Sequence, residues 1–300
     1  MAGTGWGPTL PSRTSGDRLR VRKTYKLYIA GAFPRSESGR SYPVASPVGE
    51  LLAHAAQASR KDVRDAVVAA RKAFPGWAGA TAYNRGQVLY RIAELLDGRR
   101  EQFAAEVRAA EGGSAAAAVA TVEQAIDRWV WYAGWADKYA QVTGSANPVA
   151  GPYFNFSLPE PTGVVGALAP QESSLLGLVS VVAPIITTGN TTVIVASRER
   201  PLPAVSLTEV LATSDLPGGV VNLLTGFPAE LAPWLASHRD VNAIDLTGVD
   251  PADRPALQRA AADNVKRVFA PADEDWQPDP STARLAAFVE TKTVWHPVGV

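Results

Sequence analysis

From Gly163 to Gly226 the chain reads GVVGALAPQESSLLGLVSVVAPIITTGNTTVIVASRERPLPAVSLTEVLATSDLPGGVVNLLTG. Short apolar runs of strand length alternate here with longer apolar runs of helix length, and Gly, Pro and Asn residues separate them. Strands that alternate with helices at this spacing imply right-handed crossovers and therefore a parallel sheet. The stretch predicts a doubly wound α/β domain of the dinucleotide-binding kind. Strands are expected at 164–168, 192–195 and 220–224, and helices at 175–187 and 203–213.

The residues on either side continue this alternation. Upstream, a helix is expected to begin at Asp62, as its N-cap, and to stop at Pro75 and Gly76. Tryptophan and tyrosine residues gather between 129 and 139, where their helical spacing favours packing in a core or interface over a cofactor cage. Further helices are expected at 82–96, 101–111 and 255–263, and further strands at 153–158 and 243–246.

Composition argues against several classes of function. The chain carries 29 basic and 29 acidic residues, so no net charge draws it to a nucleic acid, and we expect no nucleic-acid partner. It encodes no cysteine, which removes disulfides, zinc–thiolate sites, iron–sulfur clusters and thiol nucleophiles. The three histidines, His54, His238 and His296, lie far apart in the sequence, so no metal site is predicted.

The start of the chain, Met1 to Arg22, is rich in Gly, Pro, Ser and Arg and lacks the continuous apolar core of a secretory signal. Nowhere does the chain approach the roughly 20 consecutive apolar residues that a membrane-spanning helix needs. We therefore expect a disordered tail at residues 1–24, no membrane partner and a cytoplasmic location.

Five short motifs follow one another in a fixed order along the chain. They are Ala133-Gly134-Trp135-Ala136-Asp137-Lys138, Pro161-Thr162-Gly163-Val164-Val165-Gly166, Gly189-Asn190-Thr191, Leu216-Pro217-Gly218-Gly219-Val220-Val221-Asn222 and Leu246-Thr247-Gly248. In this order and spacing they resemble the aldehyde dehydrogenase family, over most of the chain from Tyr25 to about Val268. The resemblance implies a helical N-terminal region, an oligomerisation hairpin near residues 140–160 and a Rossmann-type domain that binds a dinucleotide.

The end of the chain, FVETKTVWHPV from Phe288 to Val298, resembles the strand that closes aldehyde dehydrogenases at their C-terminus and extends a sheet of the neighbouring subunit. In the family a catalytic domain on the order of 150–200 residues precedes that strand, whereas here only a short polar stretch does. The resemblance therefore implies an N-terminal and cofactor-binding domain over 25–269, a linker over 270–287 in place of the catalytic domain, and an oligomerisation strand over 288–300.

The resemblance also implies that the family's reaction is absent from this chain. The cysteine nucleophile is not encoded. The family's oxyanion asparagine aligns with Glu172, whose carboxylate would repel a developing oxyanion at a place where one donor is commonly worth about 3 kcal/mol. The family's general-base glutamate aligns with residues 270–273, which contain no glutamate. No catalytic residue is therefore predicted.

Two serines at the same place, Ser173 and Ser174, raise the alternative of a hydrolase. No Gly-x-Ser-x-Gly elbow surrounds them, and no histidine lies in a motif that would place it against either hydroxyl. Capping of the helix expected from Leu175 is the favoured interpretation.

Remnants of the family's cofactor site are predicted at three positions. Glu199 matches the glutamate of the family's Lys-Pro-Ser-Glu motif, whose lysine is absent here. Gly226 matches the first glycine of a Gly-x-Gly motif, and Pro228, which lacks an N–H, replaces the second. Gly248 matches the glycine of Thr-Gly-Ser, and Val249 replaces its serine. Since each lost charge-assisted contact typically costs on the order of 1.5–3 kcal/mol, we expect no cofactor, or NAD only weakly.

These observations together predict a non-catalytic subunit of the aldehyde dehydrogenase family. Its expected partner is a full-length, cysteine-containing aldehyde dehydrogenase, reached through the strand from Val289 to Trp295 and the hairpin around Tyr153 to Leu158. The chain by itself is then no enzyme, and NAD(P)-dependent aldehyde oxidation belongs to the partner. Three alternatives stay open: an enzyme, either an aldehyde dehydrogenase of unusual type or one whose site is completed by its partner; a dinucleotide-sensing subunit; and a degenerate homo-oligomer.

Overall fold

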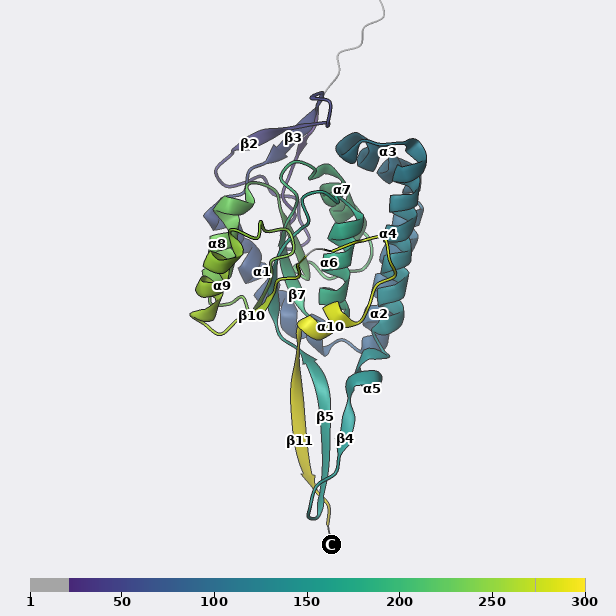
Figure 1. The fold of residues 1–300 in the computed structure, drawn as a ribbon, viewed down its shortest axis with the longest axis vertical. Coiled ribbons are helices and arrows are strands. Elements are labelled where there is room, and N and C mark those ends of the chain that lie inside the picture. The colour runs from purple at the N-terminus through teal and green to yellow at the C-terminus, as the bar shows by residue number, and fades with distance from the viewer. Residues whose placement is uncertain (1–21, 273, 300) are drawn as a thin grey trace, which may run out of the picture.

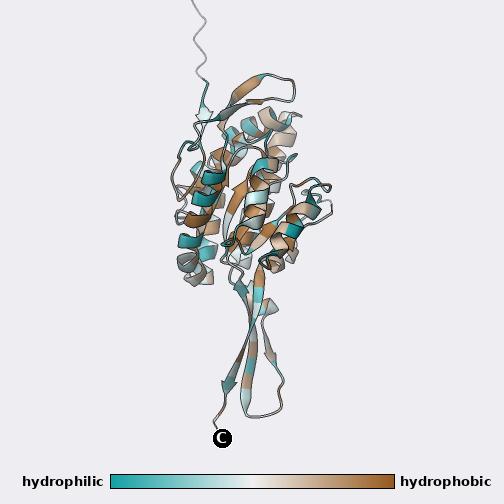
Figure 2. Ribbon diagram, turned by 90° about the vertical axis from the view of Figure 1, so that its left-hand side faces the viewer, coloured by the Kyte–Doolittle hydropathy of each residue, from teal (hydrophilic) through white to brown (hydrophobic). Residues whose placement is uncertain are grey.

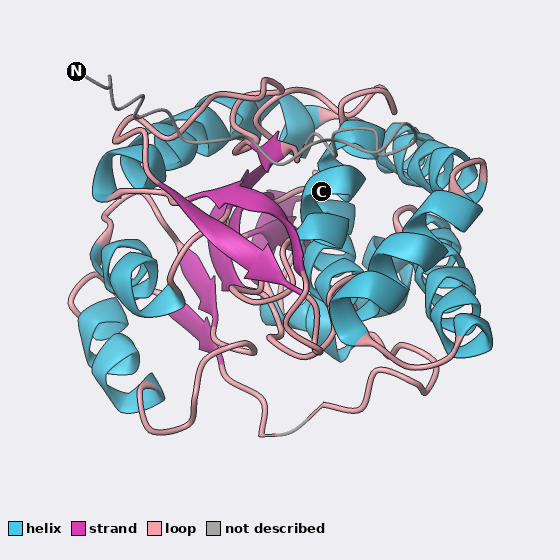
Figure 3. Cartoon of the chain, turned by 90° about the horizontal axis from the view of Figure 1, so that it is seen from above, coloured by secondary structure: helices cyan, strands magenta, loops and turns pink. Residues whose placement is uncertain are grey.

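A five-stranded parallel sheet forms the centre of the chain in the computed structural model, which describes residues 22–272 and 274–299. Its strand order is β10-β9-β6-β7-β8, and all its neighbouring strands run parallel, as the alternating apolar runs predict. Seen from above, the strands lie between helices on both sides (Figure 3). The strands are β6 (Val164–Leu168), β7 (Thr191–Val195), β8 (Val221–Leu224), β9 (Ala243–Asp245) and β10 (Arg267–Phe269).

Side chains of the central strands alternate between two cores. In β6, Val165 and Ala167 pack into the core that contains α6 and α4, whereas Val164 and Leu168 pack into the core that contains α1 and α8. All positions of β6 are buried because both faces of the sheet are covered. The covering helices are α1 (Arg60–Gly79), α2 (Ala82–Asp97), α3 (Arg100–Glu111), α4 (Ala115–Trp135), α6 (Leu176–Thr187), α7 (Leu202–Leu211), α8 (Pro228–Ser237) and α9 (Arg254–Ala262), as Figure 1 shows.

Both ends of α1 differ from the prediction. Ser59, not Asp62, is the N-cap, and Asp62 returns the bond as the third helical residue, its carboxylate accepting from the Ser59 N–H at 2.7 Å. Pro75 lies inside the helix and does not stop it. The last turn persists because buried Trp77 donates its indole N–H to the Ile186 carbonyl at 2.9 Å. Tertiary packing here outweighs the local preference of proline.

The aromatic residues between 129 and 139 fall in α4 and in the short helix α5 (Tyr139–Thr143). Trp129 and Tyr132 are fully buried in the core between α4 and α6, which agrees with the interpretation as packing residues. Among the described ranges of the chain, no helix combines the length and the apolar character needed to cross a bilayer.

A small N-terminal sheet contains β1 (Thr24–Tyr25), β2 (Ser41–Ala45) and β3 (Leu51–Ala56) in the order β1-β3-β2. Thr24 pairs with His54, so the tail predicted for residues 1–24 is too long at its C-terminal end. The rest of that prediction, residues 1–21, lies outside the described residues.

A three-stranded antiparallel sheet projects from the body of the molecule (Figures 1 and 2). It contains β4 (Ser145–Asn147), β5 (Tyr153–Pro161) and β11 (Val289–Pro297) in the order β11-β5-β4. We call it the projecting sheet. The C-terminal strand was expected to leave its own subunit, but β11 pairs with its own β5 over all 9 residues of that strand, and only its outer edge remains available.

The residues between β10 and β11 do not form the simple linker predicted for 270–287. We call residues 274–288 the strap; it contains the short helix α10 (Ala283–Ala287), and Leu285 and Phe288 are fully buried. Arg128 of α4 donates to the carbonyls of Trp276 and Pro278 at 2.8 and 3.0 Å, which holds the strap against the helical layer. The region predicted as a linker is therefore packed against the body of the molecule.

Candidate functional site

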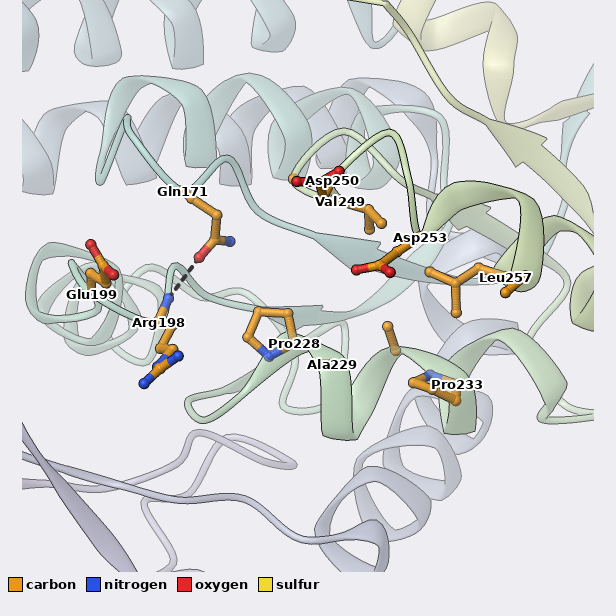
Figure 4. Close-up of a pocket in the computed structure, with 13 residues that line it drawn as sticks. Gln171, Arg198, Glu199, Pro228, Ala229, Pro233, Val249, Asp250, Asp253 and Leu257 are labelled. Carbon is orange, nitrogen blue, oxygen red and sulfur yellow. Dashed lines mark hydrogen bonds between the residues drawn. The ribbon is translucent and has the colours of Figure 1, made fainter.

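A cleft of about 490 Å³ opens between α8 and α9, at the edge of the central sheet where the parallel strands end. Its walls come from the loops that follow β6, β7 and β9 and from the two helices (Figure 4). Ligands of open α/β sheets bind at this carboxyl edge. We call it the α8–α9 cleft.

The walls of the cleft are mostly apolar, and Arg198, Glu199, Asp250 and Asp253 are the charged residues among them; Asp253 lies beside Leu257 (Figure 4). Pro228, Ala232 and Leu257 line the space between the helices. Glu199 and Arg198 follow β7, and the guanidinium of Arg198 lies 4.3 Å from the centre of the Phe227 ring. The backbone N–H of Arg198 donates to the side-chain oxygen of Gln171 at 3.0 Å, which ties two of the loops together (Figure 4). The arrangement suits a flat, weakly polar group inside and hydroxyl groups at the rim.

The structure brings two of the three predicted cofactor residues together. Glu199 and Gly248 both line the α8–α9 cleft. A side chain at Gly248 would meet the Ala169 carbonyl oxygen at 1.9 Å, so glycine is what allows these two loops to approach each other. Gly226 does not line the cleft; it has a φ of +146° and packs against the backbone of Ala58. We interpret Gly226 as a residue of the turn after β8.

A second chamber of about 390 Å³ continues from the cleft and shares Gln171, Gly248, Val249 and Asp250 with it. Its opposite wall is built partly by the strap, through Glu274 and Trp276, and by the preceding Pro271 and Ala272. Arg254 of α9 bridges the walls, because its guanidinium donates to the carbonyls of Val249 and Pro271. The cleft and the second chamber therefore form one groove along the carboxyl edge of the sheet.

Glu172 lines the second chamber and is exposed, and the serines beside it serve the fold. The Ser173 hydroxyl accepts from the Gly177 N–H at 2.9 Å in the first turn of α6, and Ser174 donates to a carboxylate oxygen of Glu111 at 2.6 Å. Across the described residues, no histidine lines either chamber. Nothing there places an imidazole against a serine, so the hydrolase alternative finds no support in the geometry.

The residues that the sequence did not point to are the apolar ones. Pro233, Ala232 and Leu257 face one another only because α8 and α9 pack together, and nothing local to either helix announces that contact. The sole signal in the sequence is the inward position of Leu257 in the expected helix 255–263. Within the described part of the chain, no group of three or more His, Cys, Asp or Glu side chains is placed to hold a metal ion.

Comparison with known proteins places this geometry. The family model described as "Aldehyde dehydrogenase family" matches residues 33–271, the greater part of the chain. The chain belongs to the aldehyde dehydrogenase family. It is 34% identical to human retinal dehydrogenase 2 over 265 residues, which are 86% of this chain and 50% of that protein. It is 35% identical over 248 residues to the mitochondrial aldehyde dehydrogenase family 2 member B4 of Arabidopsis thaliana, 81% of this chain and 45% of that protein.

Solved aldehyde dehydrogenases share the fold. HpcC from Thermus thermophilus superimposes with a TM-score of 0.79 at 31% identity, over 83% of this chain and 48% of that one. An NAD⁺ complex of aldehyde dehydrogenase from Bacillus cereus superimposes with a TM-score of 0.78 at 26% identity, over 83% of this chain and 50% of that one. This aldehyde dehydrogenase family member thus spans about half the length of the relatives it matches.

The expectation that no cofactor binds is wrong. Both the Bacillus cereus enzyme and a betaine aldehyde dehydrogenase from Staphylococcus aureus, with a TM-score of 0.78, hold NAD⁺ on this fold. The substitutions remove polar contacts of the family's site, but they leave the apolar space between α8 and α9, which several distant segments create together. The apolar side chains of Pro228 and Leu257 and the carboxylate of Glu199 would suit the adenosine half of a dinucleotide.

Proposed function

We propose that this chain is an NAD⁺-binding, non-catalytic subunit that assembles with a full-length, cysteine-containing aldehyde dehydrogenase. One observation carries the proposal: a chain of 300 residues keeps the groove of the family's cofactor fold but encodes no cysteine that could act as the nucleophile. In an active family member, bound NAD⁺ accepts the hydride that the aldehyde loses. Here the residues described above serve binding and assembly.

The α8–α9 cleft supports binding of the adenosine half. Apolar walls at Pro228 and Leu257 suit the base, and the carboxylate of Glu199 can accept hydrogen bonds from ribose hydroxyls. The phosphate end has fewer donors, because Pro228 has no N–H and Val249 has no hydroxyl. We therefore expect the adenosine half to supply most of the affinity.

Glu172 supports the non-catalytic part of the proposal. It occupies the position of the family's oxyanion asparagine, and a carboxylate there would oppose the charge that develops on an aldehyde oxygen under attack. Restoring a cysteine alone would therefore not restore the reaction.

The projecting sheet supports the assembly part of the proposal. The register of β5 and β11 places Phe154, Phe156, Leu158 and Val294 on one face, beside Glu160, Lys292 and His296, and places Tyr153 and Trp295 on the other. Phe154 and Leu158 are 51% and 43% exposed, and the sheet extends away from the body of the molecule, with α5 against its near end (Figure 1). A sheet is stable when its apolar face is packed against another layer, so a second chain is the natural cover. The outer edge of β11 adds a row of backbone groups that a partner's sheet can extend.

The cofactor is tested by calorimetric titration of the purified chain with NAD⁺. Ala256→Trp, inside the cleft, is expected to weaken binding by at least about tenfold, because the indole fills the space meant for the base. Ala262→Trp, exposed on the same helix but outside the cleft, is the matched control and is expected to bind normally. Absence of any NAD⁺ binding by the unmodified chain would refute this part of the proposal.

The partner is tested by purification from the native source, with identification by mass and an assay of aldehyde oxidation. A stoichiometric complex with a cysteine-bearing aldehyde dehydrogenase is expected. Leu158→Glu on the apolar face should abolish it, whereas Thr291→Glu on the opposite face should leave it intact. Recovery of this chain alone would contradict the assembly proposal, and aldehyde oxidation by the isolated chain would contradict the non-catalytic one.

A further inference from the structure

The strap is fixed to the groove by one buried arginine. Arg284, in α10, is 7% exposed, and its guanidinium donates to a carboxylate oxygen of Asp245 at 2.8 Å and to the hydroxyl of Thr247 at 2.8 Å. It also donates to a carboxylate oxygen of Glu274, at 3.1 Å from Nε. Asp245 ends β9 and is fully buried, so its charge depends on Arg284 for compensation.

The residues that Arg284 holds are those that enclose the second chamber. Thr247 lines that chamber and precedes Gly248, which lines both chambers. Glu274, with Trp276, forms the chamber wall that the strap provides. When the strap is docked, Arg284 therefore connects the two walls of the second chamber through its hydrogen bonds to Thr247 and Glu274.

The other end of α10 leads directly to the projecting sheet. The Phe288 carbonyl accepts from the side-chain amide of Asn190 at 2.8 Å and from the Thr162 N–H at 3.2 Å. The next residue, Val289, begins β11. Along the chain, only the rest of α10 and Phe288 separate Arg284 from β11, the strand proposed to contact the partner. Release of the strap would free the start of β11 and open the second chamber at the same time.

We infer that a dinucleotide that fills both chambers holds the strap docked and thereby orders α10 and the start of β11. The inference rests on the proposed NAD⁺ binding and concerns its regulation of assembly. A ligand can shift such an equilibrium only by contacting one state better than the other, and the strap wall of the second chamber exists only in the docked state. AMP reaches only the α8–α9 cleft and leaves the strap as it was. Because coupling is reciprocal, partner binding at β11 also tightens binding of the dinucleotide.

The test is hydrogen exchange of the full chain, measured by mass spectrometry without ligand, with NAD⁺ and with AMP. At a ligand concentration about ten times the dissociation constant, exchange across α10 and the start of β11 slows by up to about elevenfold if the open strap does not bind. NAD⁺ is expected to produce this slowing, and AMP is expected to slow exchange only around the cleft. An equal effect of both ligands on α10, or none from NAD⁺ despite binding in calorimetry, overturns the inference alone. No binding in calorimetry overturns the proposed cofactor as well.

Two variants weaken the connection that Arg284 makes between the strap and Thr247. Arg284→Lys keeps the charge beside Asp245 but cannot reach Thr247 and Glu274 with a forked group. Thr247→Val replaces only the hydroxyl with a methyl group. It still tests the inference if Arg284→Lys folds poorly. Hydrogen exchange of each variant is measured at an NAD⁺ concentration about ten times its own dissociation constant, so that a change in affinity does not mimic a change in coupling. Both are expected to lose most of the NAD⁺ effect on α10, and Thr213→Val, whose hydroxyl bonds within its own helix end, is expected to keep it. Full protection in both linking variants would overturn the inference.

Discussion

The central sheet and the projecting sheet bury their side chains to very different degrees. Every residue of β6 and β7 is buried, whereas in β5 only Asn155 is buried and in β11 none is. The helices of the same chain lie on both sides of the central sheet (Figure 3), whereas most of the projecting sheet extends away from the helices (Figure 1). The first sheet is packed by helices of its own chain, and the second one leaves most of its side chains at least partly exposed.

The largest effect is expected at the strap, which packs against the helical layer that covers the central sheet. Arg284→Met leaves the buried carboxylate of Asp245 uncompensated and should lower the free energy of unfolding by about 3–5 kcal/mol. Urea unfolding measures the loss. Combining the change with Asp245→Asn removes the stranded charge and should recover much of the loss. A loss below about 1 kcal/mol for the single variant would mean that the strap is no part of the central core.

A matched pair of substitutions compares the two sheets directly. Val193→Ala in β7, where the side chain is fully buried, should cost about 2–3 kcal/mol from lost burial and the cavity left behind. Val294→Ala in β11 removes the same two methyl groups from a partly exposed position and should cost less than about 1 kcal/mol. If both variants lost the same free energy of unfolding in urea, measured on the isolated chain, the two sheets would not differ in how much their valines are packed. In the purified complex the second loss should grow, since the partner then covers Val294.

The smallest effect concerns the ion pair that joins the two sheets. Arg267 of β10 donates to Glu290 of β11 at 2.8 Å, and this hydrogen bond lowers the pKa of the Glu290 carboxyl below its ordinary value. A carboxyl with a lowered pKa in the folded state stabilises above its unfolded pKa, and that contribution is lost as the pH falls through the folded pKa.

Both partners of this pair are largely exposed, so Glu290→Gln should cost less than about 1 kcal/mol at pH 7. The difference between the variant and the unmodified chain should shrink from pH 7 to pH 3, because the carboxyl is protonated as the pH falls through its lowered folded pKa. Thermal unfolding at the two pH values checks this, with Lys292→Gln as a control that breaks the neighbouring pair with Glu160 instead. A difference at pH 3 as large as that at pH 7 would argue against the ion pair as its cause.

Local signals predicted the central sheet well. The expected strand 164–168 coincides with β6, and those at 192–195 and 220–224 differ from β7 and β8 by one residue at one end. Continuous apolar runs bounded by Gly and Pro suffice for buried parallel strands, because both faces must be apolar. Family membership also followed from the order of short motifs, and the family model agrees with it.

What the sequence could not predict arises from contacts between distant segments. Pro75 continues α1 because Trp77 is tied to Ile186, more than one hundred residues away by its numbering. Arg284 falls within the expected linker 270–287, yet it is buried and pairs with Asp245, which lies inside at the end of β9. The α8–α9 cleft was missed for the same reason, and that omission produced the wrong expectation about the cofactor. Substituted side chains can be counted in a sequence, but a space between two packed helices cannot.

Because β11 lies at the edge of its sheet, the number of free copies of the chain affects the risk of aggregation. An unpaired strand edge is a template for further strands, and a second copy presents the same edge. Glu290 and Lys292 place charges along the strand and Pro297 interrupts its end, which slows such growth without closing the edge. Copies of the chain whose edge stays uncovered are therefore the first candidates for aggregation, and synthesis in step with the proposed partner would keep their number low.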